Sequence, residues 1–275
     1  MSIKTWLITG SSQGFGRELV KQLLEKGENV IATTRSEAAL QEFRIFGDRL
    51  MIKELDLKNR ESCFSLVEEV LSRFGQIDVL INNAGYGQGG AIEEVSEDAW
   101  REQFEINVFG TLNITQAVLP RMRERKSGYI QVLSSIAGLK STPGIGFYNG
   151  TKFALEGLFE AMAQELAPLN IGVTIIEPGP FRTNFAGNSF RAAQNQLKDY
   201  DSTAGSFREY IKNANGNQAG DPIKAAKIMI ELEESKKKPV RLLLGKTAVK
   251  TYIGKLQLEM NRVEEFKTLS ESADF

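Results

Sequence analysis

The sequence predicts an α/β fold, with one doubly wound parallel sheet of about seven strands and helices on both faces. Short, almost continuously apolar runs, typical of strands buried on both faces, alternate with longer runs of helical periodicity. A glycine-rich stretch follows the first apolar run and opens the first helical run. In such sheets, ligands bind beyond the carboxyl ends of the strands. The expected strands are 5–9, 29–34, 50–54, 79–82, 129–133, 173–177 and 240–244, and the expected helices are 15–26, 60–74, 97–125, 147–167 and 221–233.

We expect residues 1–275 to form a single domain, because no linker or internal repeat interrupts the alternation. The segment 184–220 departs from it, being rich in Asn, Gln, Ser, Ala and Gly with scattered Phe and Tyr. Long irregular insertions often form lids, so we expect a substrate-binding loop here, with a disordered surface loop as the alternative. The tail 247–275 has a helical pattern that could cap the core or contact another subunit.

The composition excludes several classes of function. A net charge of −1 gives no basic excess for nucleic-acid binding, and no apolar run approaches the roughly 20 residues that span a bilayer. With one cysteine no intrachain disulfide can form, so we expect a reducing, cytoplasmic location. The chain contains no histidine, which excludes a Ser-His-Asp triad, a His-ligated zinc and a His general base, and we expect no metal site.

The run from Thr9 to Gly16 contains the pattern Gly-x-x-x-Gly-x-Gly, between the first expected strand and the first expected helix. A tight turn here requires residues without a Cβ, and a phosphate needs close access to backbone N–H groups. The N-terminus of the following helix favours an anionic pyrophosphate. The pattern therefore predicts a dinucleotide site, with an ordinary glycine-rich turn as the alternative. The candidate contact residues are Gly10, Ser12, Gly14, Phe15 and Gly16.

The end of the second strand indicates which dinucleotide binds. An acidic residue there would hold the ribose 2′-hydroxyl of NAD, whereas a nearby arginine accommodates the 2′-phosphate of NADP. The sequence has Thr34 at the acidic position and Arg35 directly after it, and guanidinium geometry suits phosphate. We therefore expect NADP(H) to be preferred and NAD(H) to be possible, with a solvated surface side chain as the alternative for Arg35.

Tyr148 and Lys152 lie four residues apart in a helical pattern, so their side chains share one face. A neighbouring ammonium lowers the pKa of a phenol, which then exchanges a proton with a carbonyl or an alcohol. Of the six tyrosines, only Tyr148 has a lysine at this offset, although a structural pair is the alternative. Ser134 and Ser135 end the fifth strand, where a hydroxyl could bind the substrate oxygen or cap a helix or turn.

These residues together resemble the short-chain dehydrogenase/reductase family over nearly the full chain. The run from Thr9 to Gly16 is similar to the family's cofactor motif, and Asn82-Asn83-Ala84-Gly85 is similar to its NNAG motif. Segment 178–185 resembles the hydroxysteroid and retinol dehydrogenase-like branch. The resemblance implies a Rossmann-type fold and an oxidoreductase. Four residues match the catalytic tetrad in order and in the Ser-to-Tyr spacing: Asn107, Ser135, Tyr148 and Lys152.

The resemblance also implies a role for each residue. Tyr148 would exchange the proton, and Lys152 would bind the nicotinamide ribose and lower the pKa of Tyr148. Ser135 would orient the carbonyl, and Asn107 would hold a water in the proton relay. One departure is Gln13, which stands where some NADP-preferring members carry a basic residue. Besides Tyr148 and Lys152, the implied cofactor contacts are Asp56 at the adenine, Pro178, Gly179 and Thr183 at the nicotinamide, and Asn83, Ala84 and Gly85.

We therefore expect an NADP(H)-dependent oxidoreductase that acts on a carbonyl or a secondary alcohol, with a hydrophobic substrate indicated by the aromatic residues of 184–210. One alternative is a non-catalytic regulator that senses dinucleotides, although such regulators can lose the tyrosine that this chain keeps. A sugar epimerase fits less well, because those relatives usually differ in glycine spacing. From the family we also expect a homodimer or a homotetramer.

Overall fold

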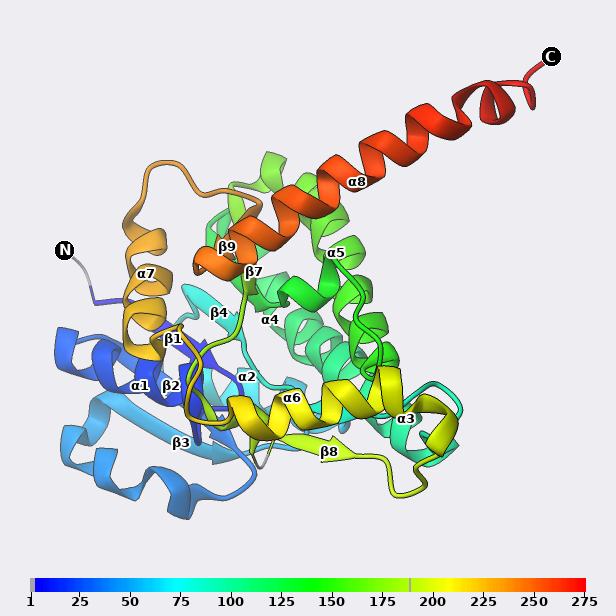
Figure 1. Ribbon diagram of the computed structural model, residues 1–275. Coiled ribbons are helices and arrows are strands. Elements are labelled where there is room, and N and C mark those ends of the chain that lie inside the picture. The colour runs from blue at the N-terminus through cyan, green and yellow to red at the C-terminus, as the bar shows by residue number, and fades with distance from the viewer. Residues whose placement is uncertain (1–2, 188) are drawn as a thin grey trace.

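The computed structural model describes residues 3–187 and 189–275, and a parallel sheet of seven strands lies at its centre (Figure 1). The strand order β3-β2-β1-β4-β6-β7-β9 shows that the chain winds outward from β1 in both directions, which confirms the predicted doubly wound sheet. The strands are β1 (Thr5–Ile8), β2 (Asn29–Thr34), β3 (Leu50–Glu54), β4 (Val79–Asn82), β6 (Gly128–Leu133), β7 (Ile171–Pro178) and β9 (Arg241–Leu244).

Helices cover both faces of this sheet, as predicted. Because successive side chains of a strand point to opposite faces, Leu7 packs in the core beneath α2, α4 and α5. Its neighbours Trp6 and Ile8 pack instead in the core beneath α1 and α7. The helices are α1 (Gly14–Lys26), α2 (Arg60–Phe74), α4 (Thr111–Arg125), α5 (Gly146–Leu166) and α7 (Pro222–Glu234), and the short 3-10 helices are η1 (Glu37–Arg49), η3 (Ile136–Gly138) and η4 (Ala167–Leu169).

The single helix expected at 97–125 is interrupted, and the expectation of one regular helix was wrong. α3 ends at Phe104, after starting at Glu97, and α4 begins at Thr111. Between them lies η2 (Glu105–Gly110), a turn of π-helix. An extra residue in one helical turn barely changes the hydrophobic periodicity, which is why the sequence pattern did not reveal it.

Two short strands outside the main sheet join distant parts of the chain. β5 (Gly87–Gly89) follows β4 closely and pairs in parallel with β8 (Phe190–Ala192). β8 belongs to the segment 184–220, so this pairing fastens the segment near the carboxyl end of β4. The other elements of the segment are η5 (Asn184–Ala186), η6 (Lys198–Tyr200), the π-helical η7 (Asp201–Gly205) and α6 (Ser206–Ala214).

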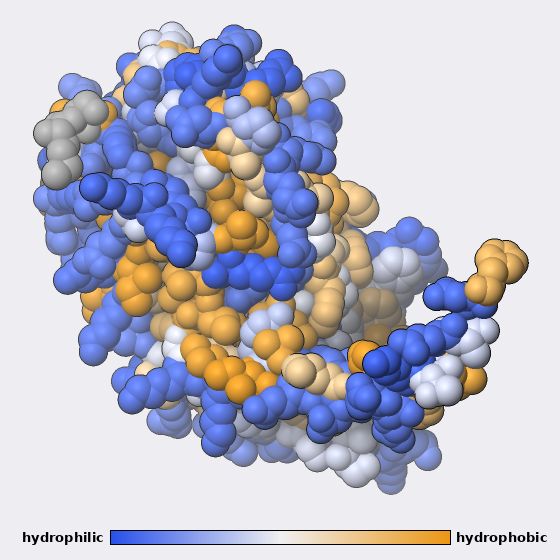
Figure 2. Space-filling view, turned by 90° about the horizontal axis from the view of Figure 1, so that it is seen from above, coloured by the Kyte–Doolittle hydropathy of each residue, from blue (hydrophilic) through white to orange (hydrophobic). Residues whose placement is uncertain are grey.

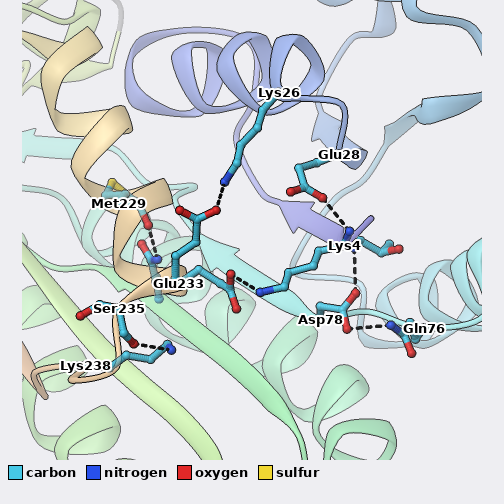
Figure 3. Close-up of polar contacts among 12 residues, drawn as sticks. Lys4, Lys26, Glu28, Gln76, Asp78, Met229, Glu233, Ser235 and Lys238 are labelled. Carbon is cyan, nitrogen blue, oxygen red and sulfur yellow. Dashed lines mark hydrogen bonds and ion pairs between the residues drawn. The ribbon is translucent and has the colours of Figure 1, made fainter. Parts of the chain in front are cut away.

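Polar contacts fix the start of β1, at the opposite edge of the sheet from its carboxyl ends (Figure 3). The backbone N–H of Lys4 donates to Glu28 at 2.6 Å, and the Lys4 ammonium forms an ion pair with Glu233 of α7. The N–H of Thr5 donates to Asp78 at 2.8 Å, just before β4. These contacts hold the amino edge of the sheet and leave the carboxyl edge to the glycine turn and its neighbours.

The last helix, α8 (Lys246–Glu271), begins against the body of the protein, where Ala248 is buried, and then extends away from it (Figure 1). Within residues 3–187 and 189–275, none of the helices combines the length and the apolar character that crossing a membrane requires.

Candidate active site

The glycine turn between β1 and α1 has no room for side chains. Gly10 and Gly14 adopt φ values of 67° and 56°, in the left-handed region that favours glycine. A Cβ on Gly16 would lie 2.4 Å from the carbonyl oxygen of Gly10 and 2.6 Å from the amide nitrogen of Asn83. The three glycines therefore leave the backbone of this turn open to close approach, which fits a pyrophosphate.

The segment after β4 supports this turn through hydrogen bonds and backbone contact. Asn83 Nδ2 donates to the carbonyl oxygens of Thr9 and Gly10, both at 2.9 Å. In return, Thr9 Oγ1 accepts from the N–H groups of Asn83 and Ala84 at 3.0 and 3.1 Å. A Cβ on Gly10 would lie 2.8 Å from the Cα of Ala84, so the two segments touch through their backbones. The side chain of Asn83 thus holds the shape of the turn.

The N-terminus of α1 points its unpaired backbone N–H groups toward the turn, as every helix start does. The N-cap residue Gln13 makes no capping contact with its side chain. That side chain bridges instead to the segment after β7: it donates to Ser189 Oγ at 2.6 Å and accepts from Asn184 at 3.0 Å. Gln13 therefore connects the glycine turn to segment 184–220.

The two residues predicted to choose the dinucleotide lie together at the end of β2. Thr34 is buried, and its hydroxyl is hydrogen-bonded to the backbone of Ser36 at 3.2 Å. Arg35 is exposed beside it. Asp56 lies just beyond the neighbouring strand β3, where it is exposed and accepts from the N–H of Lys58 at 3.0 Å. All three belong to the same edge of the sheet as the glycine turn.

The segment predicted to hold the nicotinamide also reaches the glycine turn. β7 ends at Pro178, and the N–H of Gly179 donates to the carbonyl of Leu244 at 3.0 Å. Thr183 lies against the turn, because a Cβ on Gly14 would be 3.4 Å from the Thr183 Cβ. The structure therefore brings the cofactor candidates of β1 and β7 within contact, although they are far apart in the sequence.

Asn107 is positioned by the π-helical turn. Its amide side chain pairs with the backbone of Tyr86, accepting from the N–H at 3.0 Å and donating to the carbonyl at 2.9 Å. It also donates to Thr151 Oγ1 at 3.2 Å. A Cβ on Gly85 would lie 3.2 Å from Asn107 Oδ1 and 3.8 Å from Lys152 Nζ, so these two side chains share the space in front of Gly85. π-Helical turns are frequent at functional sites, and here the turn places the Asn107 amide next to the space that the Lys152 ammonium borders.

Lys152 is buried beneath the sheet edge. Its ammonium donates to the carbonyl oxygen of Leu133 at 2.6 Å and lies 5.7 Å from the centre of the Tyr148 ring. Burial lowers the pKa of Lys152 to about 8, against the opposing effect of the Glu156 charge one helical turn away. The side chain is thus a cation near neutral pH that gives up its proton more easily than an ordinary lysine.

Tyr148 is also buried, with 8% of its surface exposed. Burial raises its pKa to about 12, and a hydrogen bond with Ser135 lowers it in part. The expected lowering by Lys152 was wrong for this structure, because the ammonium donates to the Leu133 carbonyl and only Ser135 opposes the effect of burial on the pKa of Tyr148. Ser135 Oγ also accepts from the N–H of Ala137 at 3.1 Å, so this serine both caps η3 and touches the phenol.

Aromatic side chains from segment 184–220 cover Tyr148. The ring of Phe185 lies 5.3 Å from that of Tyr148, and Phe190 and Phe207 continue the cluster at 6.2 and 6.3 Å. A Cβ on Gly89 would lie 2.3 Å from the Phe190 ring, so β5 requires glycine there to admit the ring. The side of the site that segment 184–220 covers is therefore apolar.

A buried carboxylate holds this covering segment in place. Glu94, fully buried, accepts from the N–H groups of Ala91 and Leu197, both at 2.8 Å. It also forms an ion pair with Arg208 of α6 at 2.8 Å. Burial alone would raise the pKa of Glu94, but the two backbone donors and Arg208 together hold it below its usual value. We call this group of contacts the Glu94 latch.

A second buried acidic group lies behind Lys152. Glu156, one turn further along α5, faces Glu177 near the end of β7, and Arg241 lies 3.6 Å from Glu156. Burial, together with the charge of Glu156, raises the pKa of Glu177 to about 8. Glu177 therefore holds its proton to higher pH than an ordinary glutamate does. Sequence reasoning missed this pair, and its only signal was two acidic residues inside otherwise apolar runs.

The family model for short chain dehydrogenases matches residues 4–194, more than half of the chain. The chain belongs to the short-chain dehydrogenase family. Membership makes it an oxidoreductase that uses a nicotinamide cofactor and acts on CH–OH or C=O groups. The match ends inside segment 184–220, so the part of the chain that carries α6, α7 and α8 lies beyond it.

Several known proteins are similar to this short-chain dehydrogenase. Oxidoreductase BOA17 of Botryotinia fuckeliana is 37% identical over 254 residues, covering 92% of each chain. The 3-ketodihydrosphingosine reductase of Bacteroides thetaiotaomicron is 40% identical, covering 75% of this chain and 74% of the relative. Human retinol dehydrogenase 8 is 37% identical, covering 76% of this chain and 68% of the relative.

Solved structures confirm the fold of the whole chain. A short-chain dehydrogenase from Streptomyces avermitilis is 39% identical, with a TM-score of 0.94 and coverage of 100% of both chains. A Burkholderia phymatum family member in complex with NAD has a TM-score of 0.82 at 23% identity, with coverage of 96% of this chain and 95% of its own. NADP-bound ElxO has a TM-score of 0.75 at 23% identity, with coverage of 90% of this chain and 100% of its own.

Proposed function

We propose that this short-chain dehydrogenase is an NADP(H)-dependent reductase of hydrophobic carbonyl compounds, and that Tyr148 is its acid/base. The observation that carries the proposal is the meeting of Tyr148, Ser135 and Lys152 at the edge of the sheet, beside the glycine turn. Phenol, hydroxyl and ammonium converge there under an apolar cover, which suits a ketone or aldehyde that must be held dry while its oxygen takes up a proton.

The side chains divide the work of carbonyl reduction. Ser135 would donate a hydrogen bond to the substrate oxygen and so fix the carbonyl beside the phenol. Because burial raises the pKa of Tyr148 to about 12, its phenol stays protonated in the free protein and can donate a proton. Lys152 would hold the nicotinamide ribose and stabilise the phenolate that the donation leaves. When bound, the nicotinamide supplies the hydride.

The relay behind the phenol would run through Asn107. The amide of Asn107 borders the same space as the Lys152 ammonium in front of Gly85, and its fixed pairing with Tyr86 leaves it no freedom to turn away. A water held between Asn107 and Lys152 would return a proton to the lysine, and thus to Tyr148, after each turnover. The lowered pKa of Lys152, about 8, favours such an exchange.

NADP(H) is the cofactor that the end of β2 favours. Thr34 offers no carboxylate to bind the 2′-hydroxyl of NAD. The exposed guanidinium of Arg35 therefore has no carboxylate at position 34 that would compete with a 2′-phosphate. The solved neighbours hold NAD in one case and NADP in another, so the fold itself accommodates either dinucleotide.

The cover over Tyr148 favours an apolar substrate. Phe185, Phe190 and Phe207 make the phenol's surroundings aromatic, and segment 184–220 as a whole would act as the substrate-binding lid. Two similar proteins are named for long apolar compounds, a 3-ketodihydrosphingosine and a retinol. Long-chain ketones and aldehydes are therefore the first substrates to supply.

The test follows the absorbance of the reduced nicotinamide, with NADPH and then NADH, against short and long-chain aldehydes and ketones. We expect faster oxidation of NADPH and a lower KM for the longer carbonyls. Arg35→Ala should remove the preference for NADPH, whereas Arg44→Ala, at another exposed arginine of the same region, should preserve it. A preference for NADH would contradict the assignment of NADP(H) but not the proposed reductase activity. Tight cofactor binding without turnover on any carbonyl would favour the dinucleotide-sensing regulator.

A further inference from the structure

The C-terminal part of α8 projects from the rest of the protein. The helix starts with the buried Ala248, yet every residue from Met260 to Phe275 is exposed. Figure 1 shows this part extending away from the sheet and its helices, and Figure 2 shows it projecting at the edge of the face seen from above. An isolated helix of about 12 to 15 residues is only marginally stable in water. A projecting helix of this kind is therefore expected to have a partner.

One side of α8 carries an apolar stripe that is open to such a partner. Its members are spaced by four, three, four and three residues, which places them on one face of a helix. Their exposed fractions rise from 41% near the body to about 70% in the projecting part. The stripe consists of Val249, Ile253, Leu256, Met260 and Val263.

The charges of α8 identify what covers this stripe. Residues 246–258 contain three lysines and no acidic residue, a net charge of +3. Residues 259–274 contain five acidic residues against one arginine and one lysine, a net charge of −3. Within one helix this order is unfavourable, because the helix dipole prefers acidic residues at the N-terminus and basic residues at the C-terminus. The same order is complementary when a second, identical helix runs in the opposite direction.

We propose that α8 binds the α8 of a second copy of this chain in antiparallel orientation, stripe against stripe, and so makes the protein a dimer. With the stripes in register about Leu256, each basic half, of net charge +3, faces residues 254–266 of the partner, which contain three acidic and two basic residues and have a net charge of −1. The arrangement is two-fold symmetric, because the same surface serves both copies. Burial of the stripe supplies the attraction, and the two charged halves set the direction, since exposed ion pairs add little affinity but penalise wrong pairings.

The first experiment measures the mass of the full chain by light scattering. Met260→Gln with Val263→Gln removes the most exposed end of the stripe and should convert the dimer to monomer, or a tetramer to dimer. The control is Leu258→Gln with Leu269→Gln, which removes two exposed apolar residues from the other side of α8 and should leave the mass unchanged. A wild-type monomer, or equal masses for both double variants, would overturn the proposal. So would a monomer that binds phosphatidylcholine vesicles through this stripe, since the partner would then be a lipid surface.

The second experiment tests the direction of pairing by exchanging charges. One variant, Lys246→Glu with Lys250→Glu, changes the basic half to a net charge of −1. Another, Glu264→Lys with Glu271→Lys, changes the acidic half to +1, by the same arithmetic on the +3 and −3 of the two halves. Each variant alone should dissociate at low salt, and an equimolar mixture should form a mixed dimer. Variants that dimerise alone as well as the wild type, or a mixture that stays monomeric, would contradict antiparallel pairing.

Discussion

The two sides of the active site are built in different ways. The cofactor side consists of backbone: Gly10 and Gly16 lie so close to their neighbours that a single Cβ would overlap them. The side proposed to bind the substrate consists of side chains, in which Phe185 and Phe190 lie over Tyr148 and the Glu94 latch holds their segment. The first side is therefore fixed by close contacts between backbone atoms, whereas the second can change with few substitutions.

The largest expected effect breaks the cofactor side. Gly16→Ala would place a Cβ 2.4 Å from the Gly10 carbonyl and force the turn to move. A displacement of about 1 Å can cost about 100-fold in rate, so kcat/KM should fall by at least about that factor, with weaker cofactor binding by titration. Gly157→Ala is the control, because a Cβ there meets open space. Equal kinetics for the two variants would show that the turn is not as tightly constrained as described.

The contrast between the two sides also explains what the sequence could predict. The glycine turn, the strand ends and the Tyr148–Lys152 pair are local patterns, and the structure brings each of them to one edge of the sheet. The cover over Tyr148 depends on Phe185 and Phe190, whose positions follow from the pairing of β5 with β8, about 100 residues apart. No local pattern in the sequence predicts that pairing. The π-helical turn at Asn107 was missed for a different reason, because it changes the helical periodicity by only a single residue.

A smaller effect on activity is expected on the substrate side. Glu94→Gln keeps the size of the side chain but leaves the mostly buried Arg208 with only the exposed Asp201, at 3.7 Å, as a charge partner. Removing one partner of a buried ion pair costs about 3 kcal/mol, so the free energy of unfolding should fall by roughly that amount. With the latch loosened, the KM for long-chain carbonyls should rise while the dissociation constant of the cofactor stays unchanged.

The neighbouring residue Glu93 supplies the matched control for Glu94→Gln. Glu93 accepts from the exposed Tyr200 hydroxyl at 2.6 Å, at the surface of the same loop. Glu93→Gln should leave stability and KM near the wild-type values, because exposed contacts of this kind contribute little. If Glu94→Gln behaves like Glu93→Gln in denaturant titrations and in kinetics, the latch does not hold the cover.

The smallest expected effect concerns the buried carboxyl pair of Glu156 and Glu177, which belongs neither to the glycine turn nor to the aromatic cover over Tyr148. The folded protein holds the pKa of Glu177 near 8, above the ordinary value of 4.5. The folded state therefore binds a proton that the unfolded state has released, and stability should decline as pH rises from about 4.5 to about 8. Glu177→Gln should flatten that decline, measured by denaturant titration at several pH values.

Glu160 offers the control for this pH dependence. It also pairs with Arg241, at 2.9 Å, but its side chain is exposed, and its charge is the smallest of the effects that act on the pKa of Glu177. Glu160→Gln should therefore keep the wild-type decline between pH 4.5 and 8. A flat profile in the wild type would mean that the carboxyl pair does not retain its proton, and the description of Glu156 and Glu177 would have to be revised.

The central claim is that Tyr148 is the proton donor and acceptor of a reductase. The most direct measurement compares wild type and Tyr148→Phe for cofactor affinity and for carbonyl reduction in the same preparation. The phenylalanine keeps the ring contact with Phe185 and removes only the hydroxyl, so we predict unchanged cofactor affinity and a loss of about 100- to 10,000-fold in kcat. Turnover by Tyr148→Phe within a few-fold of the wild type would contradict the assignment.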